Sequence, residues 1–586
     1  MSQRTEITFL GRILIIVLLI APVALIATCF RDDITGAFDR VRGDDDQARQ
    51  VTPEVPQTPV LPPPSATLAP AATAASPTRV AGQATARPQT PTPTAPPAPR
   101  DTVLCAYDAF DPYHKCAYME AKGLLQDVNF QAKGFGLQYE NTSEAQKIKD
   151  LSDGKYQVLL TTVDACALYC DANTTILALV DASTGADMFV TRAEVGTLNE
   201  MAGRRACFVE GSVSEAFFLE LFGPLQLLNQ VQRVPHETLE DAIGAFERGE
   251  CDGVVGWQPD MLQLFDETGQ PKPGYTLLAD TSRFQYVLDA VIAHKPWVQQ
   301  HPQQAQAFVD GWFQAVKDST ENNQAFSRTL IDAMSTVKPV DSAFASWQEW
   351  SGIDNDRVLG ERLSKIVAEA SLDQNADALA DPNILARRID EVRTYWQQGG
   401  KTPNSIPAPD LIDPRFTLAA ADNTALRPNR APLNRTFYLA ERIPLPALSP
   451  EEQETLRRNV IAKLPVEKLD FFGNSAELKP GADAPLVEIA ELIKRTPGVY
   501  LVIEGRAAKP CGQDPQGTID FARARAERVA AVITADPLVQ GNQVIVTWPK
   551  SDDELRQRLQ FYDSCVEGEL EQDRLVLFTL NLAGQR

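Results

Sequence analysis

The chain has 586 residues, which is more than one domain usually holds and predicts about three to five folded units. It carries 55 Lys and Arg against 78 Asp and Glu, and the formal net charge of −23 argues against a general affinity for nucleic acid or for an anionic membrane surface. Hydrophobic residues make up 44% of the chain, so most of it can bury hydrophobic cores.

An apolar segment near the N-terminus, residues 13–30, contains no charged side chain and is long enough to span a bilayer. Arg4 and Arg12 precede it, which predicts that residues 1–12 are cytoplasmic and that the rest of the chain is exported. We expect an uncleaved single-pass anchor in the cell membrane, because no small-residue cleavage site follows. A removed signal peptide and a lipoprotein modified at Cys29 are the alternatives, and both also export the chain.

Residues 31–100 are first acidic and then rich in Pro, Thr and Ala, with fourteen Pro and no aromatic residue in residues 51–100. A segment of this composition cannot form a hydrophobic core. We expect a disordered, extended linker, which at about 3.1 Å per residue reaches at most roughly 150 Å over its last fifty residues.

The nine cysteines of an exported chain are expected to pair as disulfides within domains. Eight of them fall into three groups along the chain: Cys105, Cys116, Cys166 and Cys170; Cys207 and Cys251; Cys511 and Cys565. Their spacing does not fix the connectivity, and Cys166 and Cys170 also fit two buried thiols on one helix. None of the four histidines lies beside a second ligand at zinc spacing, so we expect no metal site.

From residue 101 to residue 403, apolar strands alternate with helices, which predicts parallel sheets of an α/β fold. One unit occurs twice: a helix, a Gly, a short strand and a polar tip, ending in residues 161–164 and again in residues 257–260. We therefore expect two lobes, the second at about residues 191–285, with hinge strands at residues 188–191 and 286–293. Ligands gather at the carboxyl ends of such strands, so both polar tips are predicted to face one cleft.

This order of features resembles the substrate-binding proteins of ABC transporters that serve nitrate, taurine, sulfonates or thiamine-pyrimidine precursors. The resemblance covers about residues 101–400 and rests on the first strand with Phe110 and Tyr113, residues 161–164, residues 211–214 opening a helix, residues 249–253, residues 257–259, and the strand 287–294 followed by His301 and Pro302. It implies a ligand held between two lobes and an ABC permease as partner.

The candidate ligand-binding residues lie at these polar tips. They are Asp108, Phe110, Tyr113, Thr161, Thr162, Asp164, Gly211, Ser212, Val213, Ser214, Trp257 and Asp289. Ser212 and Glu215 have the spacing of a capping box, and the same helix start is suited either to plain capping or to an anionic ligand group. The acidic tips Asp108, Asp164 and Asp260 favour a zwitterion or an amine over an inorganic anion.

After a linker at residues 404–448, residues 449–586 form a small α+β unit, with strands expected at 467–472, 499–504, 544–548 and 574–582. The unit resembles an OmpA-like domain through Phe472, residues 474–478, the Glu504-Gly505 pair, and Arg525-Ala526. The resemblance implies peptidoglycan binding by Asn474, Arg525 and Arg574. The family's Asp falls on Ala508, so we expect either weak binding or a substitute carboxylate from Asp514, in an insertion that a Cys511–Cys565 disulfide would close.

The resulting hypothesis is a membrane-tethered, extracytoplasmic solute-binding protein without enzymatic activity or cofactor, whose terminal module associates with peptidoglycan or the envelope. One alternative is a structural envelope spacer with a degenerate cleft. The other is an enzyme of the thiamine-pyrimidine type, for which His114 near Cys116 is a meagre catalytic set.

Overall fold

The computed structural model describes residues 101–586 apart from several gaps, which are 109, 126–127, 135–141, 267, 285–286, 323–324, 327, 331–332, 334–366, 429–444, 467–468, 473–474, 497, 510–511, 561, 563, 567–575 and 582–586. The predicted anchor and the linker at residues 31–100 therefore lie outside the described residues. In the part of the chain that is described, no helix has the length and apolar character needed to cross a bilayer.

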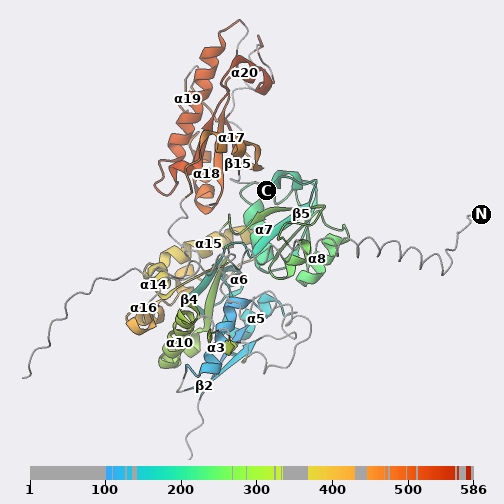
Figure 1. The fold of residues 1–586 in the computed structure, drawn as a ribbon. Coiled ribbons are helices and arrows are strands. Elements are labelled where there is room, and N and C mark those ends of the chain that lie inside the picture. The colour runs from blue at the N-terminus through green and yellow to red at the C-terminus, as the bar shows by residue number, and fades with distance from the viewer. Residues whose placement is uncertain are drawn as a thin grey trace, which may run out of the picture. The chain divides into compact units, whose positions relative to one another are not determined.

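The first lobe is built on a six-stranded sheet of order β2-β1-β3-β10-β4-β11 (Figure 1). Its strands are β1 (Thr102–Tyr107), β2 (Asn129–Gly134), β3 (Val158–Thr162), β4 (Thr174–Ser183), β10 (Leu288–His294) and β11 (Val367–Glu369). β1 pairs in parallel with β2 and β3, whereas β10 is antiparallel to both β3 and β4. The parallel half is the α/β pattern predicted from the sequence.

Helices cover this sheet and supply its hydrophobic core. They are α3 (Lys115–Lys122), α5 (Glu144–Ser152), α6 (Val163–Tyr169), α9 (Lys295–Gln300), α10 (Pro302–Glu321), α14 (Leu372–Ala380), α15 (Pro382–Gln398) and α16 (Arg415–Ala421). Trp312 on α10 and Trp396 on α15 are fully buried. Trp347 and Trp350 lie outside the described residues.

The second lobe has a five-stranded sheet of order β7-β6-β8-β5-β9. Its strands are β5 (Asp187–Arg192), β6 (Arg205–Val209), β7 (Gln232–His236), β8 (Gly253–Trp257) and β9 (Tyr275–Asp280), and its helices are α7 (Val213–Phe222), α8 (Leu239–Glu247) and the short η3 (Asp260–Leu264). β5 begins three residues after β4 ends, so the chain passes from the first lobe to the second within residues 184–186.

The predicted hinge strands belong to separate sheets, one to each lobe. β5 pairs with β8 and β9, while β10 pairs with β3 and β4. The chain instead crosses in the two short connections that precede these strands. Ser183 and Thr281 join the connections through a hydrogen bond of 2.6 Å between their hydroxyl oxygens. The sequence pattern located the strands, but a strand's apolar pattern cannot say to which sheet it belongs.

The C-terminal region is a four-stranded sheet of order β12-β15-β13-β14 with helices packed against it. Its elements are α17 (Pro450–Arg458), β12 (Val460–Lys463), α18 (Ala484–Arg495), β13 (Tyr500–Gly505), α19 (Pro515–Ile533), β14 (Val544–Thr547), α20 (Asp552–Arg558) and β15 (Val576–Asn581). The strand predicted at residues 467–472 is wrong, since its described residues make only an isolated bridge from Phe471 to Leu478. The sheet begins instead with β12.

Three disulfides lie within the predicted groups of cysteines: Cys105–Cys116, Cys166–Cys170 and Cys207–Cys251. The expectation of disulfides is thereby confirmed, and the structure decides between a bond and two thiols at Cys166 and Cys170. Cys565 is also disulfide-bonded, while Cys511 lies outside the described residues.

Candidate functional site

A row of polar side chains crosses the edge of the first-lobe sheet at the carboxyl ends of its parallel strands. Asp289 on β10 is in register with Thr162 on β3 and with Asp181 on β4. Asp181 is in turn in register with Glu369 on β11. Residues in register on neighbouring strands project from the same face of a sheet. The fold therefore places three carboxylates side by side at the edge where α/β sheets bind ligands.

Tyr113 completes this row from the loop that follows β1. Its hydroxyl group donates a hydrogen bond of 2.5 Å to Asp289 Oδ1, and both side chains are buried. Burial, followed by the charge of Asp289, raises the pKa of Tyr113 well above its usual value, so the phenol stays a donor. Phe110 lies edge-on to Tyr113 with ring centroids 5.2 Å apart. The predicted pair of aromatic residues thus flanks the predicted Asp289.

The second lobe adds Asp187 and Trp257. These residues are in register at the start of β5 and the end of β8, so their side chains share one face of the second sheet. The Asp187 charge acts on Asp164 and Asp289 acts on Asp187, both raising the pKa of the affected carboxyl group. Asp187 is therefore close to carboxylates of the first lobe, and Trp257 lies partly exposed beside it.

Asp164 forms an ion pair with an arginine of the chain. Arg388, on α15, lies 3.4 Å from Asp164 Oδ1 on α6 and 2.7 Å from Glu220 Oε1 on α7. This buried ion cluster joins helices of both lobes. Sequence analysis placed Asp164 in the ligand site, whereas the structure gives it a cation of the chain itself as a partner.

These carboxylates are almost completely buried. The exposed fractions are 1% for Asp164, 0% for Asp181, 4% for Asp187 and 3% for Asp289. Burial raises the pKa of Asp164 to about 7, although Arg388 opposes this shift, and it raises the pKa of Asp187 to about 7. It also raises the pKa of Asp181 well above its usual value, with the neighbouring Asp289 adding to the effect. We call these four residues the interlobe acidic cluster.

Several polar atoms in and around this cluster have no hydrogen-bond partner among the described residues. They are both carboxylate oxygens of Asp181, Asp164 Oδ2, Asp108 Oδ1, Glu220 Oε2 and Thr184 Oγ1. A buried polar atom without a partner costs about 1–3 kcal/mol. Atoms of this kind gathered where two lobes meet indicate a site completed by another molecule or by protons.

A second polar group, nearer β1, is completed by the chain. Lys147 Nζ on α5 lies 2.5 Å from Asp108 Oδ2 and 2.7 Å from Glu144 Oε1. Thr161 donates a hydrogen bond of 2.7 Å to the other oxygen of Glu144. Asp108 and Thr161, both predicted to contact ligand, are thus engaged with Lys147 and Glu144. We call this group the Lys147 cluster.

The start of α7 is also occupied by its own side chains. Ser212 is the N-cap, as predicted, and accepts a hydrogen bond from the backbone N–H of Ser214. Glu215 does not close the predicted capping box on Ser212; its Oε2 accepts a hydrogen bond of 2.7 Å from the N–H of Gly211. Val213 is the first residue of the helix. A carboxylate of the chain therefore stands where sequence analysis allowed an anionic ligand group.

Thr162 is the N-cap of α6, where its hydroxyl oxygen accepts a hydrogen bond from the N–H of Ala165. Asp260 is exposed at the start of η3. Asp181 and Asp187 are not among the predicted residues, although they have a recognisable signal: one is an acidic residue near the end of an apolar strand and the other begins the next strand. Trp257, Thr162 and Ser212 all lie at carboxyl ends of strands or at the helix starts that follow them.

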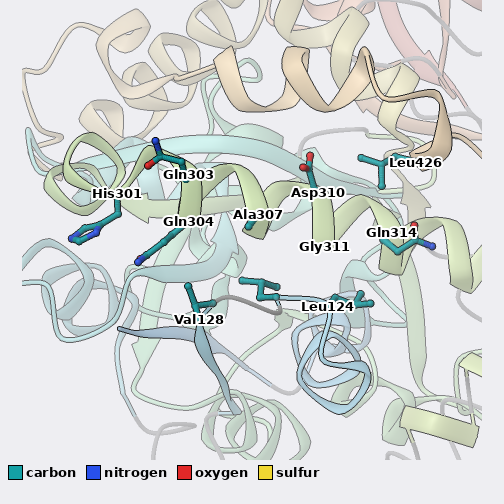
Figure 2. A pocket seen from close by; sticks show the side chains of 11 residues that line it. Leu124, Val128, His301, Gln303, Gln304, Ala307, Asp310, Gly311, Gln314 and Leu426 are labelled. Atoms are coloured by element: carbon teal, nitrogen blue, oxygen red, sulfur yellow. The ribbon is translucent and has the colours of Figure 1, made fainter. Parts of the chain in front are cut away.

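A cavity of about 560 Å³ lies elsewhere in the first lobe, along α10 (Figure 2). Leu124, Val128 and Leu426 line it together with polar side chains of α10 such as Gln304 and Gln314. None of the predicted ligand residues lines this cavity. His301 and Asp310 also line it, and it shares no residue with the interlobe acidic cluster.

One group of possible metal ligands occurs among the described residues, formed by Cys207, His236 and Cys251. The two cysteines form a disulfide, and Cys207 Sγ lies 3.2 Å from His236 Nε2. A disulfide sulfur is no thiolate ligand, so this trio offers a metal ion only the imidazole. The register of β6 with β7 brings His236 close to Cys207, a neighbourhood that sequence spacing does not reveal.

Of the predicted peptidoglycan-binding residues, Asn474 and Arg574 lie outside the described residues. Arg525, on α19, is buried; its Nε donates to the carbonyl oxygen of Ser475 at 3.3 Å, and its guanidinium lies over the ring of Phe471. Asp514 is the N-cap of α19 and accepts a hydrogen bond from the N–H of Gln516. Its carboxylate is thus used at the helix start.

Comparison with known proteins supports the predicted class of the two-lobed region. Residues 130–325 match the family model described as NMT1/THI5 like. Together with the two α/β sheets and their crossings, this match supports a substrate-binding protein with a periplasmic-binding-protein-like fold. No curated protein matches the chain.

Solved structures with a similar arrangement include the periplasmic aliphatic sulphonate binding protein SsuA from Escherichia coli, at 16% identity and a TM-score of 0.37, covering 53% of this chain and 96% of that one. The periplasmic nitrate-binding protein NrtA from Synechocystis PCC 6803 has 11% identity and a TM-score of 0.40, with 56% and 91% covered. The desulfurization enzyme DSZB has 13% identity and a TM-score of 0.36, with 55% and 99% covered.

Proposed function

We propose that the chain is an extracytoplasmic solute-binding protein that encloses a small polar molecule between its two lobes. The observation that carries this proposal is the row of Thr162, Asp289 and Asp181, which crosses three strands at the ligand-binding edge of the first sheet. Asp187 and Trp257 of the second lobe complete the ring of groups around it. Three disulfides suit an oxidising compartment.

Binding would act through closure of the lobes about the connections at residues 184–186 and 281–284. These connections are short and are joined by the hydrogen bond between Ser183 and Thr281. A ligand that contacts both lobes stabilises the closed form by the free energy of those contacts. Delivery to an ABC permease, or signalling by the closed form, would follow from this change of shape.

A thermal-shift screen of the full chain against polar metabolites tests the proposal. A ligand at one hundred times its dissociation constant should stabilise the protein by about 2.7 kcal/mol. If no metabolite raises the melting temperature, the binding function is wrong and the structural-spacer hypothesis takes its place.

The N-terminal segment is proposed to tether the chain to the membrane, and residues 449–586 are proposed to associate with peptidoglycan in the manner of an OmpA-like domain. Support for the latter comes from Arg525, which lies against the turn at Ser475 that the resemblance places at the peptide-binding site. Ala508, at the position of the family's Asp, has no side-chain carboxylate, and its carbonyl oxygen accepts a hydrogen bond of 3.5 Å from Thr518 Oγ1.

Cosedimentation of the full chain with purified peptidoglycan tests this attachment. The wild type should sediment, and Arg525→Ala should reduce the bound fraction several-fold. Arg528→Ala, on the exposed side of α19, is the matched control and should bind as the wild type does. Circular dichroism checks that each variant is folded. Equal and poor sedimentation of the wild type and Arg525→Ala would remove the wall-binding role.

A further inference from the structure

We propose that the interlobe acidic cluster binds the protonated amine of a small organic cation that carries N–H donors. This inference rests on the proposed function, because it names the ligand class of the same site. It goes beyond the acidic tips seen in the sequence, since Asp181 and Asp187 become neighbours of Asp289 only through strand register and lobe packing.

The first argument is the balance of charge between the lobes. Acidic side chains in and around the cluster outnumber basic ones by eight to three: Asp108, Glu144, Asp164, Asp181, Asp187, Glu220, Asp289 and Glu369, against Lys115, Lys147 and Arg388. Each of the three cations already lies within ion-pair distance of a carboxylate. A sulfonate, phosphate or nitrate would therefore meet carboxylates without a free counter-charge.

The second argument is independent of charge and concerns hydrogen bonds. Asp181 is completely buried and can share a proton with Asp289, which serves one of its carboxylate oxygens. Its other oxygen and Asp164 Oδ2 have no hydrogen-bond donor among the described residues. Asp181 stands in register with Asp289, so its side chain points from the same face into the cluster. These acceptors need N–H or O–H donors. A primary ammonium supplies three, whereas a quaternary ammonium supplies none.

The geometry favours an organic cation over a metal ion. A metal ion needs its ligand atoms within a few ångströms of one another, and among the described residues only Cys207, His236 and Cys251 meet that condition. The carboxylates of the cluster come from three strands and a helix in both lobes and are spread more widely. Trp257, partly exposed beside Asp187, offers a ring face to an alkylammonium group.

Four probes test the inference on the full chain by thermal shift and isothermal titration. They share one butyl group and differ in the head group: n-butylammonium, butyltrimethylammonium, 1-butanol and butanesulfonate. We expect n-butylammonium at millimolar concentration to raise the melting temperature, and the other three to have less than a tenth of its affinity.

Substitutions separate a ligand contact from a structural role. Asp181→Asn and Asp187→Asn keep the shape of each side chain and remove its charge, so both should weaken n-butylammonium binding at least tenfold. Neither should lower the melting temperature of the ligand-free protein, because each removes a buried carboxyl group from a cluster of like charges. Asp377→Asn, exposed on α14, is the matched control and should change neither quantity.

The outcomes distinguish this inference from the proposed function. Four results would each overturn the inference. They are equal binding of the trimethyl probe, binding of butanesulfonate in place of the amine, stabilisation by calcium or magnesium ions alone, and no effect of any probe. The proposed function then stands if another metabolite stabilises the protein in the wider screen. It falls only if the wider screen also finds no ligand.

Discussion

The Lys147 cluster and the interlobe acidic cluster are two buried acidic groups at the same edge of one sheet. In the first, Lys147 lies within ion-pair distance of Asp108 and Glu144, and burial is compensated by these contacts. In the second, Arg388 lies within ion-pair distance of Asp164, but no basic side chain of the described residues lies within ion-pair distance of Asp181, which has only a proton shared with Asp289. In one cluster a lysine therefore contacts both carboxylates, whereas in the other Asp181 is left to a proton or a ligand.

Among substitutions, the largest effect is expected from breaking the completed site. Lys147→Met should lower the free energy of unfolding by about 2–3 kcal/mol, because it leaves two partly buried carboxylates, whose side chains are 27% and 16% exposed, without their cation. Urea denaturation of the ligand-free protein measures this loss. Lys149→Met, which breaks an exposed pair with Asp153 on the same helix, should cost less than about 1 kcal/mol. Similar losses in both variants would contradict the contrast.

The acidic cluster should make stability depend on pH. Burial raises the pKa of Asp164 and of Asp187 to about 7, above the value of an unfolded chain. The folded protein then holds more protons than the unfolded one between about pH 4 and pH 7, so this contribution is complete below that window and is lost as the pH rises through 7. Each group loses about 1.4 kcal/mol per pH unit between pH 5 and pH 7, so we expect the free energy of unfolding to be lower at pH 8 than at pH 5 by about 5 kcal/mol for the two groups together.

Urea titrations at the two pH values, repeated on Asp187→Asn, check this dependence. The variant should show a smaller difference between pH 5 and pH 8, because one of the two titrating groups is gone. A wild-type protein that is more stable at pH 8 would show that the sign is wrong. Arg388 opposes the shift of Asp164, so Asp187 is the clearer probe.

A smaller effect is expected where the lobes touch. Gly211 has a φ of +65°, and a Cβ at this position would collide with the hydroxyl group of Tyr169 on α6. Gly211→Ala should therefore destabilise the protein by about 1–2 kcal/mol. Adding Tyr169→Phe should restore part of the loss by removing the colliding oxygen. If the double variant is no more stable than Gly211→Ala, backbone strain alone accounts for the cost.

The smallest effect is expected from neutralising the incomplete site. Asp181→Asn should leave the stability of the ligand-free protein unchanged or raise it by up to about 1 kcal/mol, because an amide can donate to Asp289. Urea denaturation at pH 7 measures the change. A loss of more than about 1 kcal/mol would show that the chain already satisfies Asp181.

Much of the fold could be predicted from local pattern. Apolar strands alternating with helices predict two α/β lobes, and the position of Ser212 predicts an N-cap. The site could be predicted only in part: Thr162 and Trp257 lie at the ends of predicted strands and Asp289 lies near the start of one, whereas Asp181 and Asp187 are not predicted. Asp164 and Asp108 carry the right chemistry, but Arg388 and Lys147 engage them, and sequence spacing cannot reveal partners from distant helices.

The alternation of strands and helices, the grouping of the cysteines and the acidic excess follow from local pattern and composition, because they depend on neighbouring residues. Which carboxylates lie together, and which have a cation as partner, depends on the folded arrangement. Strand register brings Asp289 beside Asp181, and packing of α15 carries Arg388 to Asp164. Register and packing are contacts between remote segments, and their electrostatic consequences depend on burial, which no local pattern contains.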